Sequence, residues 1–226
     1  MNSKHPEPDI SQNDPAVWAS TKEWEESFHH TRRNLQTRIH RINYFDIPKD
    51  ALILDYGCGD GLDLQAFASL GYNNVIGIDH SAQFARKICT FPAVIGDVYS
   101  LVFADASVDV IFVNSVLHHL HLPTALPEIN RILKPEGKFH FIEPRNSPFR
   151  KVLDWATLSL LAKLSATLLH RRRMLLDEWE EHYRWLAQEP RVKKILLAAG
   201  FGNIQTQHDL VNMFVSCTKL EGAQEV

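Results

Sequence analysis

The chain has 226 residues, 45% of them hydrophobic, which is enough to bury the core of one α/β domain with embellishments. Its formal net charge of -3 gives no general attraction to polyanions, so we expect no nucleic-acid partner. The three cysteines, Cys58, Cys89 and Cys217, lack a C-x-x-C pair, which argues against a disulfide framework or a cysteine zinc site. The N-terminus has no apolar signal-peptide core, and we expect a cytoplasmic protein.

The patterning predicts alternating helices and strands after a short tail. Residues 1–19 are polar and proline-rich and are predicted to be a disordered tail, with a single domain over 20–226. A helix follows, whose apolar face comprises Trp24, Phe28, Leu35, Ile39 and Ile42. Strands are predicted at 51–55, 75–79, 93–96, 108–114 and 137–143, and helices at 62–70 and 192–199. Two closing strands are predicted at 203–208 and 211–218. The apolar runs suit parallel strands that are covered on both faces.

A glycine-rich turn follows the first strand, in the sequence ILDYGCGDG over 53–61. Gly57, Gly59 and Gly61 allow a sharp turn into a helix whose amide groups can face a ligand. In the dinucleotide fingerprint G-x-G-x-x-G the third glycine comes one residue later. The spacing therefore favours a nucleoside ligand without a pyrophosphate.

The residues from about 50 to 144 resemble the class I S-adenosylmethionine-dependent methyltransferases, and in particular the type 11-like group. The resemblance is carried by the glycine turn and by four later motifs, which are VIGIDHS, IGDV, LVFADASVDVIFVNSVLHHL and EINRILKPEGKFHFIEP. It implies a Rossmann-like, doubly wound, mostly parallel seven-stranded sheet with an antiparallel C-terminal hairpin. The chain departs from the family pattern in one turn, where KPEG places Glu136 at a position that is usually glycine.

The resemblance assigns cofactor roles to ten residues. Asp55, Gly57, Cys58, Gly59 and Asn114 would hold the methionine part of S-adenosylmethionine, and Gly61 would let the helix approach. Asp79 would accept the ribose hydroxyls, and His80, Asp97 and Val98 would contact the adenine. Asp109, at the start of its strand, is instead expected to bond neighbouring backbone.

His118 and His119 are the candidate catalytic residues, because they follow the fourth strand at the edge where such sheets bind ligands. One interpretation is a general base for an oxygen acceptor. The other is that the histidines finish the strand and pack beside the cofactor. No metal site is expected, since the neighbouring sequence has no carboxylate or cysteine that completes a ligand set.

A segment at 144–190 exceeds the minimal fold and is predicted to be a helical lid. Its first half is basic and its second half acidic. The 150–173 stretch is either an ordinary amphipathic helix or a peripheral membrane contact, with HRRR facing phosphates. If Trp155, Leu158 and Leu161 line the pocket, an apolar acceptor is favoured. If Arg145 and Arg150 point inward, an anionic acceptor is favoured.

The function that follows is direct methyl transfer from S-adenosylmethionine to a small-molecule or lipid-like acceptor. Two alternatives stay open at this stage. The fold can serve a non-methylating reaction that retains the cofactor, or it can serve as a non-catalytic partner subunit. The acceptor and the oligomeric state are left open by the sequence.

Overall fold

The computed structural model describes residues 32–81, 91–159 and 166–221. The predicted tail at 1–19, Trp24, Phe28, Cys89 and Leu161 lie outside the described residues. The sheet has seven strands in the order β3-β2-β1-β4-β5-β7-β6. These strands are β1 (Ile53–Tyr56), β2 (Val75–Asp79), β3 (Ala93–Ile95), β4 (Val108–Asn114), β5 (Leu133–Pro144), β6 (Phe201–His208) and β7 (Asn212–Lys219).

The sheet is doubly wound, as predicted. Strands β1 to β5 pair in parallel, whereas β7 lies antiparallel between β5 and β6. Because β1 has β2 on one side and β4 on the other, the chain reverses direction across the sheet at this point. Ligands of open α/β sheets bind beside the carboxyl ends of the strands at such a switch point.

The strand predictions are largely confirmed, and β2 and β4 have the predicted bounds. The exception is β5, which begins at Leu133 rather than at 137. The KPEG stretch looks like a turn in sequence, but it is incorporated in the strand, and Glu136 adopts a left-handed backbone with φ of 61°. The position therefore has the conformation that favours glycine, although the residue is glutamate.

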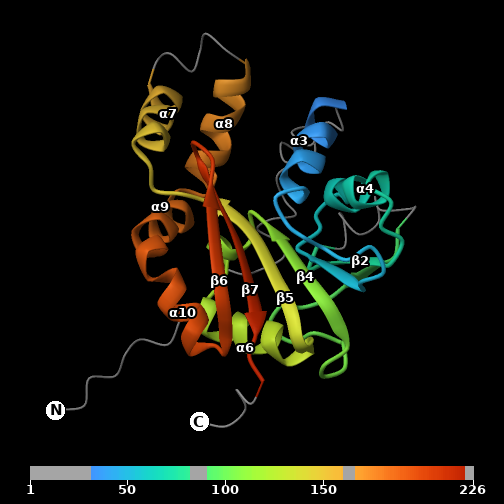
Figure 1. Cartoon of the computed structure of the whole chain (residues 1–226). Helices are drawn as coiled ribbons and strands as arrows, with labels where there is room; N and C mark the ends of the chain where they lie inside the picture. The colour runs from blue at the N-terminus through green and yellow to red at the C-terminus, as the bar shows by residue number, and fades with distance from the viewer. Residues whose placement is uncertain (1–31, 82–90, 160–165, 222–226) are drawn as a thin grey trace, which may run out of the picture.

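Helices cover both faces of the sheet (Figure 1). One core is formed with α6 (Leu122–Ile132), α9 (Trp179–Gln188) and α10 (Val192–Ala198). The other is formed with α3 (Arg32–Ile42) and α4 (Leu62–Ser69). The other elements of the described residues are two 3-10 turns, η2 (Leu117–His119) and η4 (Glu189–Arg191), and the helices α7 (Pro148–Leu158) and α8 (Ala166–Asp177).

The segment predicted as a lid divides into two parts. Helices α7 and α8 extend past the carboxyl end of the sheet (Figure 1). By contrast, α9 belongs to the main core, because Trp185 is 0% exposed and its indole Nε1 donates to the Pro144 carbonyl at 2.7 Å. Burial of this indole anchors the acidic half of the segment to the sheet. The lid prediction therefore applies at most to α7 and α8.

The basic run of α8 contacts its own protein. Arg171 pairs with Asp154 at 2.7 Å, and Arg172 donates to the Leu158 carbonyl at 2.6 Å. Two of the basic side chains of α8 thus have partners within the protein. No helix among the described residues has the length and apolarity that a bilayer span requires.

Candidate functional site

The glycine turn between β1 and α4 lies at the switch point. Gly57 has a φ of 78°, and a Cβ at this position would meet Val116 Cγ2 at 2.5 Å. The amides of Gly57 and Cys58 donate to the Ile78 carbonyl, at 2.8 and 3.0 Å. These two amides thus hold the turn against β2. Gly61, with a φ of 82°, forms the N-cap of α4, as its helix-opening role requires.

Asp79 joins the glycine turn to the end of β2. Its Oδ2 accepts the Gly59 amide at 2.9 Å, and its Oδ1 accepts the Ser81 amide at 2.8 Å. Each oxygen of an ionised carboxylate has a further lone pair, so the side chain can still accept two hydroxyl groups. His80 follows with its side chain 40% exposed and its Nδ1 3.7 Å from Asp79 Oδ1.

Asp55 is buried at the base of the same turn. Its side chain is 1% exposed, and Oδ2 has no hydrogen-bond partner among the described residues. Burial, together with the charge of Asp63, raises the pKa of Asp55 well above its usual range. A buried polar atom without a partner is costly unless a ligand supplies one. An ammonium group would both pair this oxygen and restore the ionised carboxylate.

A polar network that the sequence analysis missed lies beside Asp55. Asp63 Oδ2 accepts from Arg38 Nη1 at 3.2 Å, and both its oxygens accept from Asn114 Nδ2 at 3.2 Å. Arg41 Nη1 reaches Asn114 Oδ1 at 3.4 Å. The network brings α3, α4 and β4 together. Arg38 and Arg41 bring positive charge to this edge of the sheet.

Two of the three residues predicted at the adenine, Asp97 and Val98, follow β3. Asp97 is exposed, and its Oδ1 accepts the Tyr99 amide at 2.8 Å. Val98 is buried, and its carbonyl accepts the Tyr56 hydroxyl at 2.6 Å. This bond ties the β3 loop to the end of β1, so Asp97 and Val98 stand at the same sheet edge as the glycine turn.

The histidines after β4 form a separate cluster with two glutamates. His118 Nδ1 lies 2.7 Å from Glu143 Oε2, and its Nε2 lies 3.7 Å from Glu178 Oε2. His119 Nε2 lies 3.9 Å from Glu178 Oε1. Burial lowers the pKa of His118, but the two glutamates outweigh it and raise that pKa to about 10. Burial, with the charge of His118, lowers the pKa of His119 well below its usual range.

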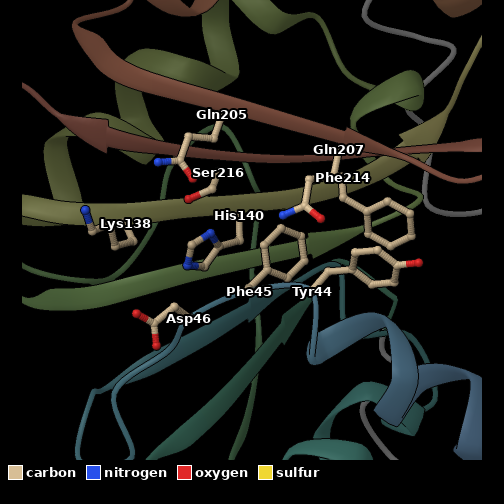
Figure 2. Close-up of a pocket in the computed structure, with 9 residues that line it drawn as sticks. All are labelled: Tyr44, Phe45, Asp46, Lys138, His140, Gln205, Gln207, Phe214 and Ser216. Atoms are coloured by element: carbon tan, nitrogen blue, oxygen red, sulfur yellow. The ribbon is translucent and has the colours of Figure 1, made fainter.

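A cavity of about 290 Å³ lies away from these residues, on the face of β5, β6 and β7 (Figure 2). Its aromatic wall is made by Tyr44, Phe45 and Phe214, and polar side chains including His140 and Lys138 complete it. None of the ten predicted cofactor residues lines it. The cofactor prediction therefore rests on the switch-point residues and not on this cavity.

The strand order, the glycine turn and the carboxylate at the end of β2 define a class I methyltransferase fold, whose cofactor is S-adenosylmethionine. A family model described as a methyltransferase domain matches residues 54–141. Over these residues the chain is similar to the S-adenosylmethionine-dependent methyltransferases.

Curated relatives match part of the chain. A putative methyltransferase from Encephalitozoon cuniculi is 32% identical over 106 residues, which are 45% of this chain and 48% of the relative. A malonyl-[acyl-carrier protein] O-methyltransferase from Herminiimonas arsenicoxydans is 29% identical over 161 residues, 69% of this chain and 54% of the relative. The chain thus spans about half the length of these two relatives.

A solved structure shares the fold over most of the chain. It is a putative methyltransferase of Haloferax volcanii in complex with the Trm112 methyltransferase activator, with a TM-score of 0.64 and 17% identity. The match covers 92% of this chain and 98% of that one. At this identity the likeness establishes the architecture and no more.

Proposed function

We propose that this protein transfers the methyl group of S-adenosylmethionine directly to a small-molecule acceptor. The observation that carries the proposal is the Asp79 carboxylate, which is held to the Gly59 amide at 2.9 Å and retains acceptor capacity for a ribose diol. The sulfonium methyl is already activated when the cofactor is bound. The protein therefore has to align the acceptor and exclude water.

The remaining cofactor contacts are proposed from the same edge. Asp55 would bind the cofactor ammonium through its unpartnered Oδ2, and Arg38 would face the cofactor carboxylate in a charge-assisted contact. Asp97, Val98 and His80 would border the adenine. The other predicted cofactor residues would border the methionine part of the cofactor. They are Gly57, Cys58, Gly59 and Gly61 of the turn, and Asn114 at the end of β4.

The acceptor is proposed to carry an acidic group. Arg150 of α7 is 4% exposed, and its Nε has no hydrogen-bond partner among the described residues. Its Nη2 donates to the Val211 carbonyl at 2.6 Å. Burial, followed by the charge of Arg171, lowers the pKa of Arg150 to about 10, although the charges of Asp154 and Asp209 oppose this shift. Trp155, which an apolar acceptor would need in the pocket, is 64% exposed. A buried guanidinium whose Nε lacks a partner favours an anion over an acyl chain.

An anionic acceptor has a consequence for the histidines. A carboxylate oxygen is already deprotonated at neutral pH, so its methylation needs no general base. The predicted base role of His118 and His119 applies only to an acceptor that loses a proton in the reaction.

Calorimetry with S-adenosylmethionine and its demethylated product tests the cofactor site. The full chain should bind both, and Asp79→Asn should weaken binding by about 10-fold to 100-fold, since hydrogen bonds to charged groups contribute about 1.5–3 kcal/mol. Asp50→Asn, at an exposed turn, is the matched control. Wild-type protein that binds neither compound would refute the proposal.

Transfer of a labelled methyl group to a panel of small acids and of uncharged analogues tests the acceptor. Turnover of an acid should fall with Arg150→Met through a raised KM and should be partly retained with Arg150→Lys. Arg173→Met, in the exposed part of α8, should have no effect. Equal turnover of acids and uncharged analogues would contradict the proposal of an anionic acceptor. The proposal for the cofactor site would still stand.

A further inference from the structure

Two histidines and a glutamate meet at the carboxyl end of β4. His118 and His119 come from η2, directly after the strand, and Glu178 stands where α8 gives way to α9. Each offers one potential ligand atom, and these atoms all lie within 4.8 Å of one another. Sequence reasoning excluded a metal here for want of a nearby carboxylate. The fold supplies that carboxylate from a distant part of the chain.

One of these imidazoles is already oriented by a second carboxylate. Glu143 is 0% exposed, and its Oε1 accepts the amides of Val116 and Leu117 at 2.8 and 2.6 Å. Its Oε2 contacts His118 Nδ1 at 2.7 Å. With Nδ1 committed to Glu143, the His118 ring presents Nε2 to Glu178. Ligating histidines in metal sites characteristically make this second contact to a carboxylate.

We propose that His118, His119 and Glu178 form a binding site for a divalent transition metal ion of the zinc type. Imidazole nitrogens with a carboxylate oxygen suit zinc, whereas calcium and magnesium prefer oxygen ligands alone. Three protein ligands leave a fourth position for water or another ligand. The proposal does not depend on the methyl-transfer reaction.

Only small movements would close the site around an ion. Glu178 oxygens lie 3.7 Å from His118 Nε2 and 3.9 Å from His119 Nε2. Ligand atoms about 2.0–2.1 Å from a tetrahedral zinc are roughly 3.3 Å apart. Rotation of the Glu178 side chain can shorten both distances by the few tenths of an ångström that this requires. The His119 side chain is 20% exposed, which gives the ion a path from solvent. Bound metal would fasten the start of α9 to the end of β4.

Metal titration of the full chain, with any affinity tag removed and after chelator treatment, tests the site. Calorimetry should show one zinc ion per chain with micromolar or tighter affinity, and cobalt should give the visible absorption of a tetrahedral site. Glu178→Gln and His119→Gln should each weaken zinc binding at least about 10-fold. Loss of a residue that only orients a ligand typically weakens metal binding by about 10–100-fold, and loss of a ligand should cost no less. Glu181→Gln on α9 and His121→Gln should bind as the wild type does.

Thermal unfolding of each metal-free variant shows whether it is folded. Glu178→Gln is the more informative variant, because glutamine has nearly the same volume as glutamate and should disturb the fold least. Absence of stoichiometric zinc binding by the wild type would overturn the proposal. Binding that survives Glu178→Gln in a folded protein would overturn it as well. Titration of the same samples with the demethylated cofactor separates the outcomes, because loss of the metal site leaves the Asp79 site intact.

Discussion

Two aspartates show how position along a strand decides the role of a side chain. Asp109 lies at the start of β4, where its Oδ2 accepts the Leu52 amide at 2.9 Å and its Oδ1 pairs with Lys134 at 2.7 Å. Its predicted structural role is therefore confirmed. Asp79 ends β2 instead, at the edge where ligands meet a parallel sheet. An aspartate at the start of a strand is therefore structural, whereas an aspartate at the carboxyl end of another strand is proposed to bind the cofactor.

His140 should make folding sensitive to acid. Its side chain is 2% exposed, and both ring nitrogens lack hydrogen-bond partners among the described residues. Burial, aided by the charge of Lys138, lowers the pKa of His140 from 6.5 to about 3. Between these values the unfolded chain binds the proton and the folded chain does not. The free energy of unfolding should therefore decrease by about 1.4 kcal/mol for each pH unit below the unfolded-state pKa.

Urea unfolding at pH 7.5 and pH 5 measures this dependence. Wild-type protein should lose about 2 kcal/mol more than His140→Gln over this interval, because only the wild type carries the buried imidazole. Exposed His208 gives the matched control, His208→Gln, whose loss should equal that of the wild type. Equal losses for the wild type and His140→Gln would show that His140 does not contribute. The charged side chains that line the cavity with His140 are Lys138 and Asp46.

At the scale of elements, local patterns located most strands, and one turn shows their limit. Proline and glycine around Glu136 indicate a turn, and they conceal the fact that β5 already begins at Leu133. The start of β5 is set by the pairing of Leu133 with Val108 of the neighbouring strand β4. Strand bounds at such places depend on the neighbouring strand, which a single sequence window does not contain.

Replacing Glu136 by glycine should stabilise the protein. The residue is exposed and has a φ of 61°, a conformation that costs most residues about 1–2 kcal/mol and glycine almost nothing. After the entropy that glycine loses on folding, the net gain should be about 0.5–1 kcal/mol in chemical denaturation. Glu136→Ala retains the Cβ and should give no gain. A destabilised Glu136→Gly variant would contradict this account of the turn.

At the scale of the whole molecule, the doubly wound topology gathers the proposed cofactor site. Strands β1, β2 and β4 are adjacent, and their carboxyl ends carry the glycine turn, Asp79 and Asn114. Helix α3 adds Arg38, which reaches Asp63 across 25 positions of sequence. Ligand binding should therefore stabilise the entire domain rather than one loop.

Bound cofactor product should raise the midpoint of thermal unfolding. A ligand at 100 times its Kd adds about 2.7 kcal/mol, which corresponds to about 5–10 °C for a domain of this size. Calorimetric scans with the demethylated cofactor measure the shift. Asp79→Asn should lose most of it at the same concentration, whereas Asp50→Asn should keep it. A full shift in Asp79→Asn would remove Asp79 from the site.

The sequence by itself determined the parts that depend on short-range pattern. These are the apolar strands, the glycine turn, and the acidic residues that end β2 and follow β3, because periodicity and turn chemistry act over a few residues. Only the tertiary structure decided which distant groups meet. It placed Glu178 beside His118, Arg38 beside Asp63, and Trp185 in the core. The physical reason is that such contacts depend on how helices pack on the sheet, and no local pattern encodes that packing.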